Sequence, residues 1–220
     1  MIIKMTKEKL PYMTAEEAAA AIIDIGRKLY EKGMVASNDG NISVRIGDDA
    51  VMITPTGVSK GALTREMLLT VTLDGELIAG SAKKSTETAM HLRLYKENPE
   101  IRVAVHAHPA FATSFAIAGI ALDAPIYPEA YAIVGEVPLA PYATPGTQEV
   151  PDSIATFACT HNAVLLSNHG ALTWGKTPGQ AYFRMESLEG YARVTMYSKY
   201  ILGSARELTS DQLKKIHIFD

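Results

Sequence analysis

Helical and strand patterns alternate along the whole chain, and this alternation limits the folds that the chain can adopt. A capping box over Thr14–Glu17 begins the first helix, and Gly33 ends it. Short apolar runs follow, and Asp74-Gly75 between two of them predicts a tight hairpin. A hairpin joins antiparallel strands, so the sequence predicts an α/β fold with an at least partly antiparallel sheet.

Residue periodicity places the remaining elements. Further strands are expected over 41–46, 50–54, 68–73, 101–107, 163–167 and 171–174. Further helices are expected from residue 85 or 86 to a point before Asn98-Pro99, from 109 onward, over 147–160, over 177–202 and, as a short stretch, within 209–220.

Composition narrows the class of protein. The length of 220 residues suits one domain, and we expect a single domain over residues 1–220. A net charge of −3 argues against nucleic acid or an anionic membrane as the main partner. The single cysteine, Cys159, excludes an internal disulfide and a Cys-rich zinc module. Residues 1–10 hold no apolar targeting segment, so we expect a cytoplasmic protein without a membrane span.

Histidines follow two of the apolar runs. His106 and His108 end the run 101–107, and side chains two apart in a strand point to the same face. Two imidazoles side by side often bind one metal ion, although exposed or hydrogen-bonded histidines fit the pair as well. His169, between Asn168 and Gly170, ends a second run and makes a three-histidine metal site a reasonable hypothesis.

A third polar segment, Ser85-Thr86-Glu87, precedes a predicted helix. Ser85 is the expected N-cap, which places Glu87 in the first turn. There Glu87 could complement the helix dipole, bind the metal or act as a base. The first-turn amides, the two hydroxyls and the flanking lysines, Lys83 and Lys84, would suit a phosphate. His91 shares the helix face of Glu87, and a structural hydrogen bond is favoured over metal ligation for it.

Two polar turns complete the set of candidates. Residues 37–41 precede a strand, and residues 54–57 follow one. Each turn is either a simple turn of turn-forming residues or a source of amides and hydroxyls for an oxyanion.

Together and in this order, these segments resemble the class II aldolase/adducin-head family, within it the L-fuculose-phosphate aldolase group. The resemblance covers residues 14–203. It is carried by Asp39–Arg45, Ile53–Gly57, Ser85–Glu87, Val105–His108, Ala140–Thr147 and Asn168–Gly170.

The resemblance implies a three-layer α/β/α sandwich around a mainly antiparallel sheet. It also implies a homotetramer with active sites between subunits. One Zn²⁺, or another divalent transition metal, would be held in each subunit by His106, His108, His169 and Glu87. The substrate phosphate would be bound at Gly40, Asn41, Thr56, Gly57, Ser85 and Thr86. Glu87 would be the catalytic base, and Tyr127 of a neighbouring subunit a second catalytic residue.

The implied activity is zinc-dependent cleavage of a ketose 1-phosphate, either L-fuculose 1-phosphate or a close deoxy-ketose analogue. The products would be dihydroxyacetone phosphate and an aldehyde. Zinc would stabilise the negative charge of the enediolate. Glu87 would transfer a proton at the enediolate carbon, and Tyr127 would donate a proton to the aldehyde-side oxygen or accept one from it.

Other activities stay open. A sugar-phosphate 4-epimerase of the ribulose-phosphate type is one alternative, and a methylthioribulose-phosphate dehydratase is another. A non-catalytic adducin-like interaction module is a third, against which the intact set of histidines and Glu87 argues.

Some positions depart from the family pattern. Lys84 stands where a proline is usual, and Thr86 replaces a serine but keeps the hydroxyl. Glu129 and Tyr131 replace small residues, and the tail, which holds Phe219, lacks a clear match to the C-terminal tyrosine of the fuculose enzymes. The departures at Glu129, at Tyr131 and in the tail concern the identity of the aldehyde that the enzyme would release.

Overall fold

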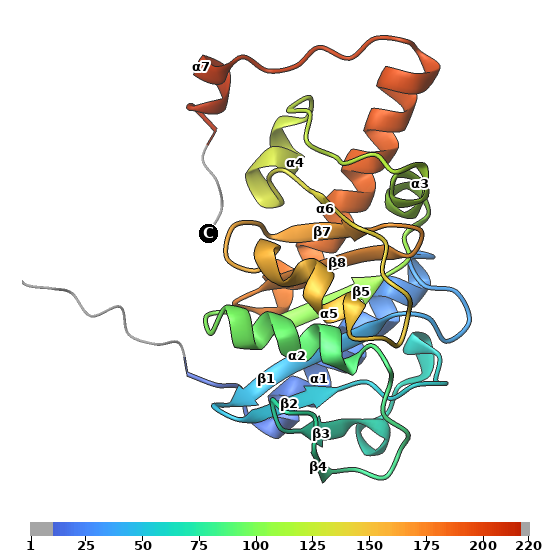
Figure 1. The fold of residues 1–220 in the computed structure, drawn as a ribbon, viewed down its shortest axis with the longest axis vertical. Coiled ribbons are helices and arrows are strands. Elements are labelled where there is room, and N and C mark those ends of the chain that lie inside the picture. The colour runs from blue at the N-terminus through green and yellow to red at the C-terminus, as the bar shows by residue number, and fades with distance from the viewer. Residues whose placement is uncertain (1–10, 217–220) are drawn as a thin grey trace, which may run out of the picture.

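One sheet of eight strands forms the centre of the protein (Figure 1). The structure is a computed structural model that describes residues 11–216. The strand order is β4-β3-β2-β1-β5-β8-β7-β6, and all neighbours are antiparallel except the parallel pair β6 and β7. The prediction of a mainly antiparallel sheet is therefore confirmed.

The strands lie close to their predicted positions, except for the two-residue strand β6, which was not predicted, and the hairpin at Asp74-Gly75 joins β3 to β4 as expected. The strands are β1 (Asn41–Gly47), β2 (Ala50–Ile53), β3 (Leu69–Val71), β4 (Leu77–Ala79), β5 (Val103–Ala107), β6 (Leu139–Ala140), β7 (Ala163–Leu166) and β8 (Gly170–Gly175).

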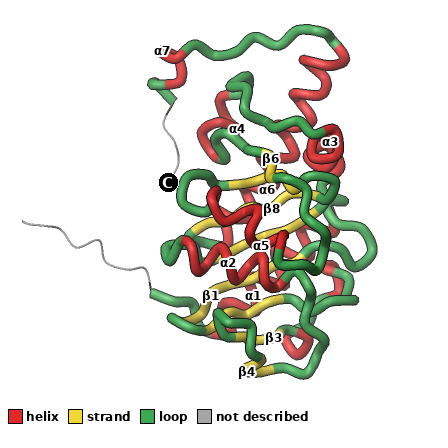
Figure 2. Tube along the Cα trace, viewed as in Figure 1, coloured by secondary structure: helices red, strands yellow, loops and turns green. Residues whose placement is uncertain are grey.

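Helices cover both faces of the sheet and make three layers (Figure 2). One face packs against α1 (Ala15–Glu31), α3 (Ala110–Ala118) and α6 (Pro178–Thr195), with α4 (Pro128–Ile133) beside α6. The other face packs against α2 (Thr88–Glu97) and α5 (Glu149–Ile154). Side chains alternate between the two faces along β5. Val103 and Val105 therefore pack in the core that α1, α3 and α6 cover, and Ala104 packs in the core that α2 and α5 cover. The three-layer prediction is confirmed.

The first helix forms for the reason that the sequence indicates. The Glu17 amide donates to the Thr14 hydroxyl over 3.2 Å, and the Thr14 amide donates to the Glu17 carboxylate over 2.8 Å. Ile22 and Leu29 then bury one face of α1 against the sheet. Gly33, with φ of 68°, ends the segment as predicted.

Several boundaries differ from the prediction. Helix α2 begins at Thr88, because the Glu87 amide donates to the Ser85 hydroxyl over 3.2 Å and closes a local turn first. The expected helix over 147–160 is shorter: α5 passes at once into a 3₁₀ turn over Ala155–Phe157. Short 3₁₀ turns also lie at Lys60–Ala62 and Arg65–Met67.

At the C-terminal end, α6 continues as a π-helix over Met196–Ile201 and so reaches the predicted end of the long helix. The tail then forms α7 (Ser210–Leu213), capped by Thr209. Phe219 lies outside the described residues. Among the helices within residues 11–216, none combines the length and the apolar composition that crossing a bilayer requires.

Gly170, the first residue of β8, gives a test of this packing. A Cβ at Gly170 would lie 2.7 Å from the Ala107 carbonyl oxygen, which belongs to the paired strand. Gly170→Ala should therefore destabilise the protein by about 1–3 kcal/mol, measured as the free energy of unfolding in urea. Gly190→Ala is the matched control, since a Cβ at Gly190 would enter open space. An unchanged stability of Gly170→Ala would show that β5 and β8 are not packed this tightly.

Candidate active site

Three histidines meet at one end of the sheet. His106 belongs to β5, His108 follows it directly, and His169 lies in the turn between β7 and β8. Their ring centroids are 4.8–4.9 Å apart, and their ligand nitrogens all lie within 4.8 Å of one another. The structure thus brings together the three histidines that the sequence singled out, with His106 and His108 on one face.

Backbone conformation places the third histidine. Asn168 adopts a left-handed conformation with φ of 59°, which turns the chain sharply between the two strands. Gly170 then packs against the His108 ring and the Ala107 carbonyl, where a side chain would collide. This turn carries His169 back over β5.

Glu87 completes the cluster from the opposite direction. One carboxylate oxygen, Oε1, lies 3.0 Å from His169 Nε2 and 3.3 Å from His106 Nε2. Glu87 is the residue at the start of α2 rather than a first-turn residue, which corrects the expected cap at Ser85. Its side chain is 18% exposed, so the carboxylate is reachable from solvent.

Two of the histidine rings, those of His106 and His108, are held in place through their Nδ1 atoms. His106 Nδ1 lies 2.9 Å from the Ala171 carbonyl oxygen, to which it donates, and this leaves Nε2 with a free lone pair. His108 Nδ1 lies 3.3 Å from Asp39 Oδ2. Outer partners of this kind typically fix the orientation of metal-binding histidines. The sequence analysis gave Asp39 no role of its own, although it stands next to Gly40 in a matching stretch.

The electrostatics of the cluster favour a cation. Burial raises the pKa of the Glu87 carboxyl, but His106 and His169 outweigh burial and hold that pKa far below its usual range. Burial, His106 and His169 lower the pKa of His108 to about 4, so this imidazole is neutral near pH 7. His106 Nε2 and His108 Nε2 lie only 3.1 Å apart. Lone pairs facing one another at this distance repel unless a proton or a metal ion lies between them, and the donor set suits a divalent metal.

The three predicted phosphate-binding segments lie next to one another around this cluster. Gly40 has φ of 78°, and a Cβ there would lie 2.7 Å from the His106 carbonyl oxygen. Thr54 ties its turn to β1, because its hydroxyl accepts from the Ile42 amide over 3.2 Å. The Thr56 amide donates to the Lys83 carbonyl over 3.1 Å, which joins this turn to Ser85 and Thr86. Gly40, Asn41, Thr56, Gly57, Ser85 and Thr86 therefore stand on three connected segments.

Two flanking residues have structural contacts. The Lys84 ammonium donates to the Gly75 carbonyl over 2.6 Å, so this lysine is bonded to the β3–β4 hairpin. His91 Nδ1 lies 2.7 Å from the Ser43 hydroxyl, which also bonds to Tyr95. Burial, with His106 adding to it, lowers the pKa of His91 to about 3. His91 is therefore a neutral, hydrogen-bonded core histidine, as the sequence analysis favoured.

Tyr127 lies apart from the cluster within one chain. It is the N-cap residue of α4 and lines a groove against α6, together with Phe183, Glu186 and Gly190. Within the described chain, the residues that line this groove include none of the histidine cluster. A catalytic role for Tyr127 therefore requires a second copy of the chain.

Lys60 is a site neighbour that the sequence analysis missed. Its side chain is 1% exposed, and its ammonium donates to the carbonyls of Asn38 and Val58. No sequence signal identifies it, because a lone lysine in a polar turn is ordinarily solvated.

Comparison with known proteins places this site in a family. The family model described as "Class II Aldolase and Adducin N-terminal domain" matches residues 20–196. A 3-oxo-tetronate 4-phosphate decarboxylase of Pectobacterium atrosepticum is 34% identical over 207 residues, covering 91% of this chain and 93% of the relative. An L-fuculose phosphate aldolase of Methanococcus maripaludis is 34% identical over 172 residues, covering 78% of this chain and 92% of the relative.

A solved structure agrees with these relatives. YgbL of Klebsiella pneumoniae, described as an aldolase, epimerase or decarboxylase, superposes with a TM-score of 0.84 at 33% identity. The match covers 93% of this chain and 99% of that one. The protein belongs to the class II aldolase/adducin family, as the resemblance implied. Decarboxylation, however, was not among the activities that the sequence analysis considered.

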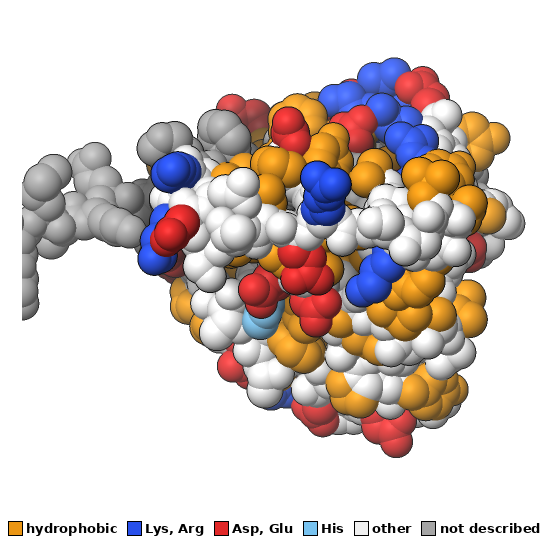
Figure 3. Space-filling view, turned by 90° about the horizontal axis from the view of Figure 1, so that it is seen from above, with side chains coloured by type: hydrophobic (Ala, Val, Ile, Leu, Met, Phe, Trp, Pro, Cys, Tyr) orange, Lys and Arg blue, Asp and Glu red, His pale blue; other side chains and the backbone are white. Residues whose placement is uncertain are grey.

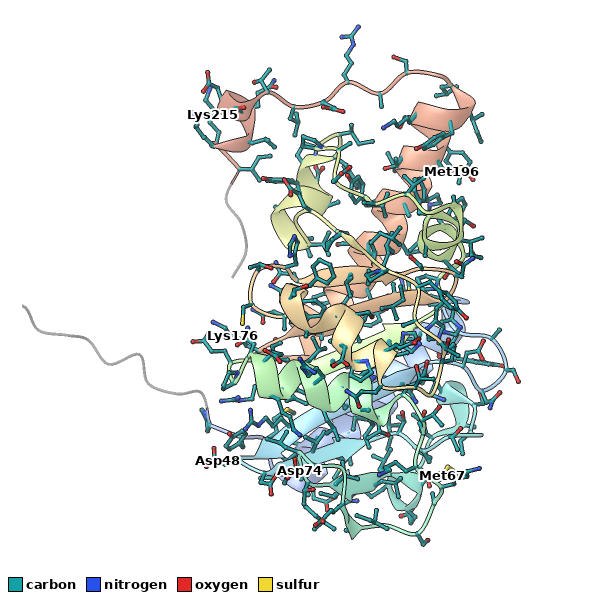
Figure 4. The ribbon with its side chains drawn as sticks, in the orientation of Figure 1. Asp48, Met67, Asp74, Lys176, Met196 and Lys215 are labelled. Atoms are coloured by element: carbon teal, nitrogen blue, oxygen red, sulfur yellow. The ribbon has the colours of Figure 1, made fainter. Side chains whose placement is uncertain are left out.

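Asp39 gives a test of the metal centre. Asp39→Asn removes the negative charge beside His108 Nδ1, so zinc affinity should fall by about 10- to 100-fold, measured by competition with a chromogenic chelator. Asp74→Asn is the control, because Asp74 is exposed on the β3–β4 hairpin (Figure 4). The unsubstituted chain should bind about one zinc. Equal affinities of the two variants would remove Asp39 from the metal centre.

Proposed function

We propose that this protein is a metal-dependent lyase that acts on a phosphorylated sugar derivative. It would break the carbon–carbon bond that joins the α-carbon of a carbonyl group to the next carbon. The observation that carries the proposal is the convergence of three imidazoles and the Glu87 carboxylate at one point. The three segments suited to phosphate surround that point.

The reactions named for the two kinds of relative, decarboxylation and aldol cleavage, pass through a common enediolate. Decarboxylation of a 3-oxo-tetronate 4-phosphate breaks the bond between C1 and C2 and releases CO₂. Aldol cleavage of a ketose 1-phosphate breaks the bond between C3 and C4 and releases an aldehyde. Both leave the same enediolate, whose protonation at carbon gives dihydroxyacetone phosphate. A site built for that enediolate can serve either reaction.

Each residue then has a role in the proposed reaction. His106, His108, His169 and Glu87 would hold a divalent ion, with zinc as our proposal for its identity. Such an ion supplies a Lewis acid for the negative charge that develops on the carbonyl oxygen. Glu87 would carry the proton to the enediolate carbon. Gly40, Asn41, Thr56, Gly57, Ser85 and Thr86 would bind the phosphate through amides and hydroxyls.

We infer that decarboxylation of a 3-oxo-tetronate 4-phosphate is the activity. Loss of CO₂ takes no proton from a substrate hydroxyl, so it needs only one group that delivers a proton. In the described chain Glu87 lies against His106 and His169 and could deliver this proton, whereas Tyr127 lies in another groove. Relatives that match nine tenths of the chain bear the decarboxylase name.

Cleavage of L-fuculose 1-phosphate or a deoxy-ketose analogue is the second candidate. It needs a group at the aldehyde-side oxygen, which Tyr127 of a neighbouring subunit would provide in the homotetramer that we propose. Exposed apolar side chains favour such an assembly, since Ile117, Tyr200, Ile201 and Leu202 are at least 46% exposed. These side chains lie near the C-terminal end of α3 and of the helical segment that continues α6. Figure 3 views the molecule from above and shows hydrophobic side chains among charged ones on this face.

A substrate comparison tests the choice. Zinc-loaded protein should convert 3-oxo-tetronate 4-phosphate with a higher kcat/KM than L-fuculose 1-phosphate, measured as CO₂ release against aldehyde release. Tyr127→Phe should leave decarboxylation unchanged, because CO₂ leaves without a proton transfer at that end. Faster aldehyde release that Tyr127→Phe abolishes would establish the aldolase instead. Formation of an epimer without cleavage would overturn both.

Glu87→Gln tests the proton transfer. The amide keeps the size of the side chain but cannot deliver the proton, so kcat should fall by about 10²- to 10⁴-fold. Circular dichroism and zinc content, measured alongside, separate this loss from unfolding or metal loss. Glu31→Gln on the exposed face of α1 is the control. Full activity of Glu87→Gln would assign the proton to another group.

A further inference from the structure

A buried lysine lies beneath two of the proposed phosphate-binding segments. Among the lysines within residues 11–216, Lys60 is the only one that is buried, with 1% of its side chain exposed. A lysine is seldom buried unless its charge has partners, so its surroundings call for an explanation.

The Lys60 ammonium connects two segments that are distant in sequence. It donates to the Asn38 carbonyl over 2.9 Å and to the Val58 carbonyl over 2.8 Å. Asn38 stands two residues before Gly40, and Val58 directly follows Gly57. One side chain therefore holds together the turn before β1 and the turn after β2. These turns carry Gly40, Asn41, Thr56 and Gly57 of the proposed phosphate site.

The charge of Lys60 differs from that of the residues around the proposed phosphate site. The proposed phosphate-binding residues are all neutral, and the carboxylates nearby, Asp39 and Glu87, would repel a phosphate. Lys84 is bonded to the hairpin. Burial lowers the pKa of Lys60, and the charges of Asp39 and Glu87 are near enough to oppose that shift. The Lys60 ammonium therefore lies between the two turns and within Coulombic reach of Asp39 and Glu87.

We propose that Lys60 is a positioning residue for the phosphate of the substrate: it fixes the two turns in their binding geometry and supplies the positive charge beneath them. The inference rests on the phosphate site of the proposed function. Because the two carbonyl bonds exist before any ligand arrives, the turns need not be ordered on binding, which favours affinity. In a poorly solvated position, the charge also acts on an anion more strongly than a surface lysine would.

Titration of inorganic phosphate into the zinc-loaded protein, followed by calorimetry, tests this role. Lys60→Met keeps the length of the side chain but removes the charge and the donors, so the Kd for phosphate should rise by about 10- to 100-fold. The KM for a phosphorylated substrate should rise with it, while zinc affinity stays unchanged. Lys60→Arg, which keeps charge and donors, should recover part of the phosphate affinity.

Lys176→Met is the matched control for charge. Lys176 is an exposed lysine just after β8, at the end of the sheet opposite the histidines (Figure 4). The Lys176→Met variant should bind phosphate like the unsubstituted protein. Equal phosphate affinity in a folded Lys60→Met would overturn the role of Lys60 and leave the proposed function standing. Failure of the unsubstituted protein to bind phosphate would instead remove the phosphate site itself.

A second measurement covers the case in which Lys60→Met does not fold. In protein labelled with ¹⁵N-lysine, the buried Lys60 ammonium should be the slowly exchanging one, and its signal should move on addition of inorganic phosphate. A Lys60 signal that stays in place while phosphate binds would contradict the proposal.

Discussion

The pairing of β5 with β1 on one side and β8 on the other is the constraint on which the site depends. In this register Asn41 lies opposite His106, and Ala107 lies opposite Ala171. The same three strands thus deliver a proposed phosphate residue, two histidines and the carbonyl that orients His106. Because backbone hydrogen bonds fix a register to one residue, a slip would turn these side chains to the other face of the sheet.

The cluster is stable only as a balance of opposed charges. Glu87 lies against His106 and His169, and Asp39 lies against His108, so two carboxylates face the three imidazoles, and a divalent metal ion between the ring nitrogens would fit this arrangement. The chain gathers these groups on rigid elements, namely strand ends and the start of α2, rather than on long loops. Such a site is organised before the substrate arrives, which is the condition for stabilising an enediolate electrostatically.

Much of the fold and the histidine cluster could be predicted because local rules act there. The capping box at Thr14, the hairpin at Asp74 and the two-residue alternation of His106 and His108 each depend on neighbours in sequence. The start of α2 was misplaced because the Ser85 hydroxyl closes a turn instead of capping the helix. Lys60 and the contact of Asp39 with His108 could not be predicted, since both depend on segments brought together only by the sheet. Neither local patterning nor the resemblance indicated decarboxylation.

The hydrogen bond from His106 to the Ala171 carbonyl links the site to the stability of the sheet. Ala171 belongs to β8, which is paired on both edges at the centre of the molecule, and His106 is fully buried. The His106 ring can leave this position only when the central strands separate, and such strands open at close to the free energy of global unfolding. The imidazole would then keep its orientation whether or not an ion is bound, so this ligand belongs to the sheet as much as to the site.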